Sequence, residues 1–140
     1  MTSAQKAASL ARVGLFAGLP PASLDALAEL AGEVAFEDGD PIVIQGQVGT
    51  GLFVVVSGAA RVVHGGQELA RLGPGEFLGE LAVIDRQPRM ASAFAMGPTT
   101  CLALASWDLF RRLDADPDLV HSLLRGLTAR LRHLSEHHSH

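Results

Sequence analysis

Glu80 and Arg89 are the two charged side chains whose types and spacing most clearly suggest ligand chemistry. Gly79 precedes Glu80 and opens a short apolar run with helical spacing. A glycine lets a ligand approach the backbone closely, and the free amides at a helix start bind anions. The planar guanidinium of Arg89 can donate to two phosphate oxygens at once. The carboxylate of Glu80 only accepts hydrogen bonds at neutral pH, so its natural partner beside a phosphate is a sugar hydroxyl.

The same two side chains could instead form a structural ion pair with each other. An exposed pair of that kind contributes only about 0 to 1 kcal/mol to stability. Such a pair needs neither the glycine nor the helix start, so the pattern favours an anion site over a structural pair.

The segment 77–92 resembles the phosphate-binding cassette of the cyclic-nucleotide-binding domains. It reads F-x-G-E-L-A-x-I, then four residues, then R-x-A-S. That family includes the bacterial catabolite activator, the regulatory subunits of cAMP-dependent protein kinase and cyclic-nucleotide-gated channels. The resemblance implies that Glu80 binds the ribose 2'-hydroxyl, that Arg89 binds the cyclic phosphate, and that the backbone amides of Ala82 and Met90 complete the phosphate contacts. The ligand-binding residues predicted within the cassette are Gly79, Glu80, Leu81, Ala82, Arg89, Met90 and Ala91.

The end of the chain resembles the helix that closes over the base in the bacterial activator. There Leu134 and Ser135 fall on the two base-contacting positions. Leu134 can form no hydrogen bond, whereas Ser135 could contribute a hydroxyl and Arg132 could lie across the base. In cGMP-selective relatives a hydroxyl residue often follows the phosphate-binding arginine. Met90 stands there and is only a weak acceptor, which favours cAMP as the ligand and leaves cGMP as the alternative.

Length, composition and charge bound the remaining possibilities. A chain of 140 residues with 48% hydrophobic residues is long enough for one globular domain with a sizeable core. The net charge is -4 and no basic run is longer than Arg111–Arg112. We therefore expect no direct nucleic-acid contact. The single Cys101 can form neither an internal disulfide nor an iron–sulfur cluster, and we expect it to pack as a small apolar side chain.

The apolar segments are too short for targeting or membrane insertion. Lys6 and Arg12 interrupt the N-terminal segment before a signal peptide can form. The longest apolar run, Leu52–Val56, cannot span a bilayer. We expect a cytoplasmic protein with no membrane insertion.

Hydrophobic periodicity predicts a mainly β fold with flanking α-helices, in which short strands form a barrel or a jelly roll, and the resemblance implies a jelly-roll β-barrel. Helical spacing covers Ala4–Val13 and Ala22–Ala31, and an apolar elbow at residues 15–19 joins them. From residue 33 the period changes to two, with glycine-rich turns between short strands. The predicted strands are Glu33–Glu37, Ile42–Gln45, Leu52–Ser57, Ala60–His64, Glu68–Leu72, Met90–Ala95 and Thr100–Ala105.

The chain is expected to end in a short helix, Trp107–Leu113 capped by Ser106, and a long helix that starts at Pro117. The leucine stripe of the long helix can pack on the barrel and still present a seam to a second copy, so a homodimer through this helix is expected. The predicted organisation is one domain: N-terminal helices at 1–32, the barrel with its short cassette helix at 33–106, and C-terminal helices at 107–140.

The predicted site is suited to binding and not to catalysis. The cassette holds no histidine, and the barrel offers only His64 as a metal ligand, so we expect no catalytic and no metal residue. The histidines at the C-terminus are more consistent with a frayed tail than with a metal site. As a mechanism, ligand binding would draw in the cassette, a hinge near Pro117 would move the last helix, and a protein partner would respond.

Three functional hypotheses follow from the sequence. The first is a regulatory domain that binds a cyclic nucleotide, and the second is the sensor half of a larger transcription regulator or channel. The third is a barrel of the same fold that has lost its ligand and serves only for protein interaction. The presence of both Glu80 and Arg89 argues against the third.

Overall fold

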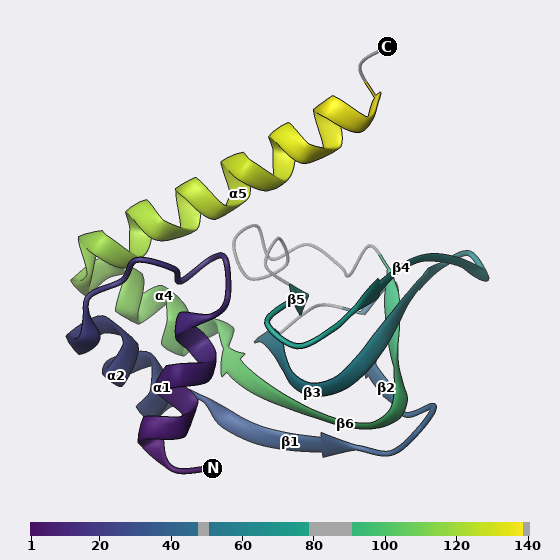
Figure 1. Ribbon diagram of the computed structural model, residues 1–140, viewed down its shortest axis with the longest axis horizontal. Coiled ribbons are helices and arrows are strands. Elements are labelled where there is room, and N and C mark those ends of the chain that lie inside the picture. The colour runs from purple at the N-terminus through teal and green to yellow at the C-terminus, as the bar shows by residue number, and fades with distance from the viewer. Residues whose placement is uncertain (48–50, 79–90, 139–140) are drawn as a thin grey trace.

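The computed structural model describes residues 1–47, 51–78 and 91–138. In this part of the chain helices flank a six-stranded antiparallel sheet. Figure 1 shows α1, α2 and α4 gathered at one end of the sheet, while α5 starts beside α4 and runs away from α1 and α2. The elements are α1 (Ser3–Ala11), α2 (Pro21–Leu30), β1 (Gly32–Phe36), β2 (Pro41–Val43), β3 (Gly51–His64), β4 (Gln67–Leu72), β5 (Phe77–Leu78), β6 (Ser92–Ala105), α4 (Ser106–Ala115) and α5 (Pro117–His138).

The sheet is built around the pairing of β3 with β6, each of which is 14 residues long. Their register runs from Gly51 opposite Ala105 to Val63 opposite Ser92. Strand order is β1-β6-β3-β4, with β2 attached to β6 and β5 attached to β3. The expectation of a mainly β fold with flanking helices is confirmed, but the described strands do not close into a complete barrel.

Two pairs of predicted strands each form one continuous strand: 52–57 and 60–64 lie in β3, and 90–95 and 100–105 correspond to β6. The glycine-containing segments between them were expected to end a strand, but β3 and β6 each run through. Gly58 has φ 84°, and the register with β6 shifts between Val55 and Ser57 and again between Ser57 and Ala59, which is the geometry of a bulge. Thr99 supports this bulge, because its hydroxyl donates to the carbonyl of Ala59 at 3.0 Å. A side chain at Gly58 would clash with the Pro98 carbonyl. The bulge therefore bends β3 without ending it.

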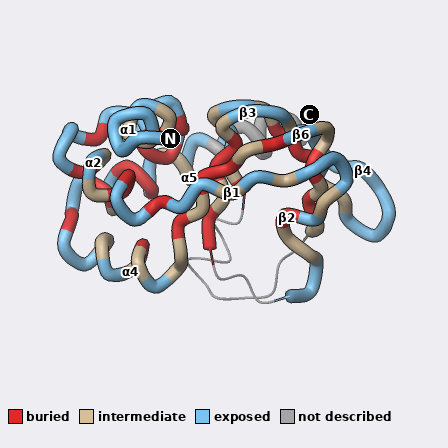
Figure 2. The backbone as a smooth tube through the Cα atoms, turned by 90° about the horizontal axis from the view of Figure 1, so that it is seen from below, coloured by how far each residue is buried: buried red, intermediate tan, exposed pale blue. Residues whose placement is uncertain are grey.

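Two clusters of buried apolar residues stabilise this arrangement. One joins α1, the elbow, α2, α4 and α5 to the sheet and includes Leu10, Phe16, Leu27 and Leu119. The other lies between the strands and contains Cys101. Figure 2 shows buried stretches where the helices meet and along the central strands. The burial of Cys101 in this cluster confirms that its side chain packs as an apolar group, and the same burial raises the pKa of its thiol to about 11.

The start of α4 differs from the sequence prediction. Ser106 was expected to cap this helix, but Ala105 occupies the cap position and makes no side-chain hydrogen bond. Ser106 is the first helical residue, and its buried hydroxyl has no partner among the described residues. The reason is that β6 continues to Ala105, so the helix starts directly from a strand residue.

Asp116 forms the junction between α4 and α5. Its carboxylate accepts hydrogen bonds from Ser23 Oγ at 2.6 Å, from the Leu119 backbone N–H at 3.2 Å and from Arg112 Nη2 at 3.4 Å. The Leu119 contact makes Asp116 the N-cap of α5, and Pro117 occupies the first helical position. The side chain of Asp116 is almost completely buried. One carboxylate thus connects α2, α4 and α5.

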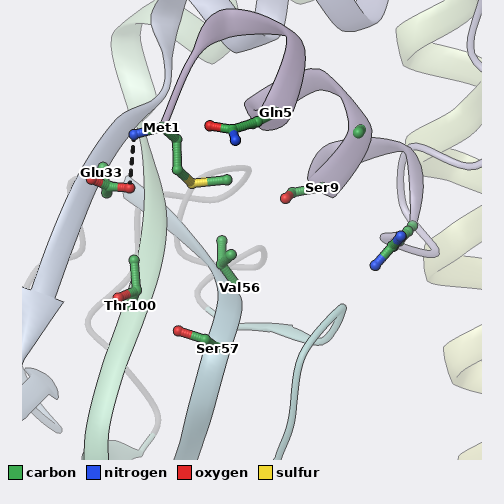
Figure 3. A pocket seen from close by; sticks show the side chains of 9 residues that line it. Met1, Gln5, Ser9, Glu33, Val56, Ser57 and Thr100 are labelled. Atoms are coloured by element: carbon green, nitrogen blue, oxygen red, sulfur yellow. Dashed lines mark hydrogen bonds and ion pairs between the residues drawn. The ribbon is translucent and has the colours of Figure 1, made fainter.

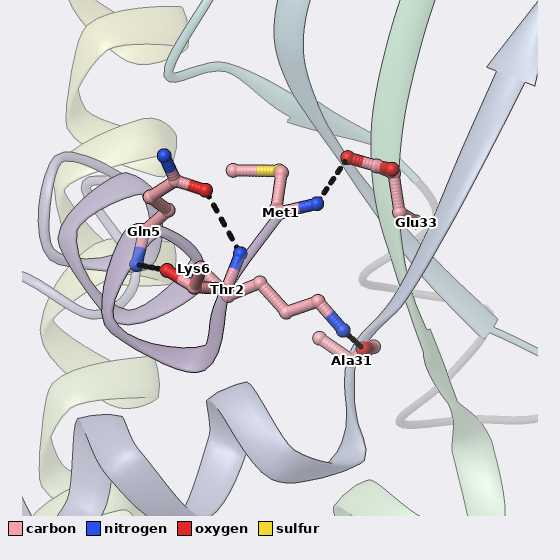
Figure 4. A network of polar contacts seen from close by, with 6 residues as sticks. All are labelled: Met1, Thr2, Gln5, Lys6, Ala31 and Glu33. Atoms are coloured by element: carbon pink, nitrogen blue, oxygen red, sulfur yellow. Dashed lines mark hydrogen bonds and ion pairs between the residues drawn. The ribbon is translucent and has the colours of Figure 1, made fainter.

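The N-terminal helix is tied to the sheet by polar contacts (Figure 4). Thr2 and Gln5 form a reciprocal capping box at the start of α1. The ammonium of Lys6 donates to the Ala31 carbonyl at 2.8 Å, and the N-terminal ammonium of Met1 pairs with Glu33 at 3.2 Å. These contacts hold α1 against the start of β1.

Within the described ranges, no helix is both long enough and apolar enough to cross a bilayer.

The Asp116 junction predicts a specific acid sensitivity. The hydrogen bond from Ser23 lowers the pKa of Asp116 below its ordinary 3.8, with smaller lowering from Leu119 and Arg112, while burial opposes the shift. A carboxyl whose folded pKa is lower stabilises the fold above the unfolded pKa, and this stability is lost as pH falls through the folded pKa. We expect Asp116→Asn to lower the free energy of unfolding by about 1 to 3 kcal/mol at pH 7 and by less below pH 3.

Urea unfolding at a series of pH values measures this difference. Asp114→Asn removes an exposed carboxylate from the last turn of α4, two residues before Asp116, and is the matched control. An Asp116→Asn penalty that stayed constant down to pH 2 would contradict the assigned role of the charge.

Candidate functional site

Both ends of the cassette are attached to β3. At its entry, Leu78 and Phe77 of β5 pair with Phe53 and Val54 near the start of β3. At its exit, Ser92 of β6 pairs with Val63 near the end of β3. The ends of the segment that carries the predicted ligand residues are therefore fixed to opposite ends of one strand.

The entry is shaped by a tight turn, Gly73–Glu76, in front of β5. Gly75 has φ 87° and donates its N–H to the Val55 carbonyl at 2.9 Å, while the Val55 N–H donates to the Glu76 carbonyl at 2.9 Å. The Glu76 carboxylate accepts from the Gly73 N–H at 3.0 Å. Glu76 therefore stabilises the turn that leads into the cassette.

The exit is held by a contact that the sequence did not indicate. The backbone N–H of Gln45 donates to Ser92 Oγ at 2.8 Å, and the Gln45 side chain accepts a long hydrogen bond of 3.4 Å from the Gly65 N–H. Ser92 closes the R-x-A-S pattern, so its hydroxyl connects the end of β2 to the start of β6. No local pattern marks Gln45, because its partners lie 47 and 20 residues away.

Apolar side chains lie at both ends of the cassette in the sheet. Leu78, the second residue of the cassette, and Ala93, directly after its last residue, belong to the same buried cluster. Val55, Ala60 and Leu72 of β3 and β4 complete that part of the cluster. The cassette thus starts and ends on a packed apolar layer, which holds its ends in a fixed relation.

Most of the predicted ligand residues lie outside the described residues. These are Gly79, Glu80, Leu81, Ala82, Arg89 and Met90. Ala91 is described and is half-buried directly before β6, and Arg132 is exposed on α5. Ser135 also belongs to α5, although its side chain is not among those described. The ligand roles predicted for these residues stay predictions.

A pocket of about 420 Å³ lies elsewhere, between α1 and the sheet (Figure 3). It is open, and the one carboxylate in its lining, Glu33, is already paired with the Met1 ammonium. Arg12 is the other charged side chain of the lining, and one arginine does not make the group of convergent cations expected of an anion site. Its lining residues are Met1, Gln5, Ala8, Ser9, Arg12, Glu33, Val56, Ser57 and Thr100.

Comparison with known protein families shows the family to which the chain belongs. A model of the cyclic nucleotide-binding domain matches residues 33–116, which cover the whole sheet, the cassette and α4. The chain belongs to the cyclic nucleotide-binding domain family. The resemblance drawn from the cassette is therefore confirmed.

Individual relatives of this cyclic nucleotide-binding domain agree. It is 39% identical over 123 residues to the Cyclic AMP receptor protein of Thermus thermophilus, covering 84% of this chain and 57% of that protein. It is 33% identical over 129 residues to a CRP-like cAMP-activated global transcriptional regulator of Mycobacterium tuberculosis, covering 88% of this chain and 57% of the regulator. The chain thus spans just over half the length of these relatives.

A solved structure confirms the jelly-roll architecture with flanking helices. The catabolite activator protein of Thermus thermophilus superposes with a TM-score of 0.80 at 37% identity, over 89% of this chain and 61% of that one.

The prediction of no direct nucleic-acid contact is contradicted by these relatives. A matching protein is named a global transcriptional regulator, and such proteins act on DNA. The prediction was wrong because it used the net charge of 140 residues. That charge describes this stretch alone, whereas the relatives extend well beyond the matched part.

Leu78 provides a direct test of the apolar layer beside the cassette. It is 7% exposed, so Leu78→Ala should leave a cavity and lower the free energy of unfolding by about 2 to 5 kcal/mol. Leu69 on β4 is 61% exposed, and Leu69→Ala should change stability by less than about 0.5 kcal/mol. Urea unfolding of both variants gives the comparison, and equal effects would show that Leu78 is not part of a packed layer.

Proposed function

We propose that this chain is a cAMP-binding sensor domain whose C-terminal helix transmits the bound state. The observation that carries the proposal is the position of the G-E-L-A and P-R-M-A-S sequences inside the family match, in the one segment between β5 and β6. The names of the relatives support cAMP, since two of them are described by cAMP binding or activation. Met90, which offers no donor to a guanine, favours cAMP over cGMP.

Within this proposal each cassette residue has a physical role. Arg89 forms paired hydrogen bonds to the cyclic phosphate, and Glu80 accepts from the ribose 2'-hydroxyl. Gly79 allows close backbone approach, and the amides of Ala82 and Met90 complete the anion site. Leu81 and Ala91 line it.

The base would be contacted from α5. Arg132 would stack on it and Ser135 would offer a hydroxyl. Both residues belong to α5, the helix proposed to transmit the bound state, so the same helix would contact the ligand and pass on the signal.

The domain is proposed to act as the sensor half of a longer cytoplasmic transcription regulator. The relatives that extend beyond the match support this, because one of them is named a transcriptional regulator. Their names describe receptors and regulators, which supports a binding function without catalysis. The functional organisation would be the N-terminal helices at 1–32, the ligand-binding sheet at 33–106, and C-terminal helices from 107 onward.

Calorimetric titration with cAMP, cGMP and AMP tests the ligand. We expect heat with cAMP, a weaker response with cGMP, and none with AMP, which lacks the ring phosphate. At 100 times its dissociation constant cAMP should add about 2.7 kcal/mol of stability, or about 10 °C in Tm. Arg89→Ala should remove most of this gain, and Arg89→Lys should restore little because an ammonium cannot form the paired contact.

Arg111→Ala is the matched control, since it removes an exposed arginine from α4. Equal Tm shifts for Arg89→Ala and the unaltered protein would remove Arg89 from the phosphate site. An absence of heat with all three nucleotides would contradict the ligand assignment and favour an interaction domain of the same fold.

The exposed face of α5 supports a homodimer. Leu124 and Leu131 are 58% and 67% exposed, and Leu127 between them completes a spacing of three and four residues. This spacing is typical of helix pairing. We expect Leu124→Gln with Leu131→Gln to convert the dimer to a monomer in analytical ultracentrifugation. Leu69→Gln, which removes an equally exposed leucine from β4, should leave the mass unchanged. A monomeric unaltered protein would overturn the proposal.

A further inference from the structure

The first ten residues of α5 and the rest of that helix have different surroundings. On the first part, Leu119, Ser122 and Leu123 are buried, and Gly126 faces the elbow. The described side chains from residue 128 onward, at positions 128, 129, 131 and 132, are exposed. A single straight helix therefore consists of a docked part and a solvent-facing part.

Two residues of the docked part, Ser122 and Gly126, lie against Leu15 in the elbow. Ser122 Oγ donates to the buried Leu15 carbonyl. One helical turn later, a Cβ added at Gly126 would come within 2.8 Å of Leu15 Cδ2 and 3.1 Å of its Cα. The helix thus lies closer to the elbow than a residue with a side chain at position 126 would allow.

The third contact is the Asp116 junction at the start of the helix. Ser23, which donates to Asp116, lies 93 residues away on α2, so this bond ties α5 to the N-terminal helices. Asp116 and Gly126 are ten residues apart, or about 15 Å along the helix. A rotation of about 20° at Pro117 would therefore displace Gly126 by about 5 Å, breaking the Ser122 bond and uncovering Leu15.

We infer that Asp116, Ser122 and Gly126 fix α5 to the N-terminal helices as far as residue 126, so that ligand-dependent movement of α5 pivots after Gly126. This places the flexible point about three turns later than the Pro117 hinge expected from the sequence. The residues that position α5 in this way are Ser23, Asp116 and Ser122. The ligand-dependent part of the inference rests on the proposed function, whereas the docking of residues 117–126 does not.

Distances between spin labels on introduced cysteines test the inference. Cys101 is fully buried and its thiol is hardly ionised, so it should not take up the label. Glu29→Cys with His121→Cys reports on the docked part, and Glu29→Cys with Ala129→Cys reports beyond it. All three labelled positions are exposed. Dilution with unlabelled chain removes distances between subunits, and calorimetry on the same samples records whether cAMP binds.

We expect the 29/121 distance distribution to stay the same with and without saturating cAMP, and the 29/129 distribution to shift. A cAMP-induced shift of the 29/121 distance beyond the width of its ligand-free distribution would place the hinge before residue 121 and overturn the inference. So would bound cAMP with neither distance changed.

A ligand-free experiment decides the role of the two hydrogen-bonded contacts even if cAMP does not bind. Ser23→Ala with Ser122→Ala should broaden the 29/121 distribution and speed amide hydrogen exchange of residues 119–126 by about tenfold, as expected when buried hydrogen bonds are lost. Thr128→Ala is the matched control, because its hydroxyl donates only within α5, to Leu124 O at 2.7 Å. Equal exchange in the double variant and the control would overturn the inference. If the double variant unfolds by circular dichroism, Ser23→Ala alone serves with the same criteria.

Discussion

The antiparallel pairing of β3 with β6 is the constraint on which the other features depend. These two strands carry the longest ladder of the sheet, and every other strand except β4 and β5 attaches to β6. The cassette leaves from a strand paired with the start of β3 and returns into the first residue of β6. The other end of β6, at Ala105, continues directly into α4. The cassette and the C-terminal helices are thus connected through a single pair of strands.

The helical end of the molecule is held together by a different kind of interaction. Its apolar cluster is non-directional, so it would tolerate sliding of α5 on its neighbours. The hydrogen bonds of Asp116 and Ser122 are directional, and each joins α5 to a partner about one hundred residues away in the chain. Burial provides most of the stabilisation, while these few polar contacts select one orientation of the helix.

The sequence predicted the cassette, the family and the order of the elements because these are encoded locally. The glycine, the two charges and their spacing lie within a short segment, and the helices follow the apolar period closely. The continuity of β3 could not be read in the same way, since Gly58 looks like a turn residue until Thr99 is placed beside it. β5 is two residues long and has no period to detect. The partnership of Ser23 with Asp116 joins distant positions that carry no common pattern.

The β3–β4 hairpin offers a practical consequence. Its two-residue loop, Gly65–Gly66, has φ angles of 57° and 81°, as in the tightest hairpin turns, and joins strands whose tips are exposed. Neither glycine has a neighbour within 4 Å of an added Cβ. A fluorescent protein inserted between these glycines would enter the chain without disturbing either apolar cluster. Because β3 also pairs with both ends of the cassette, this insertion point places the fluorescent protein on the strand that a change in the cassette would reach first.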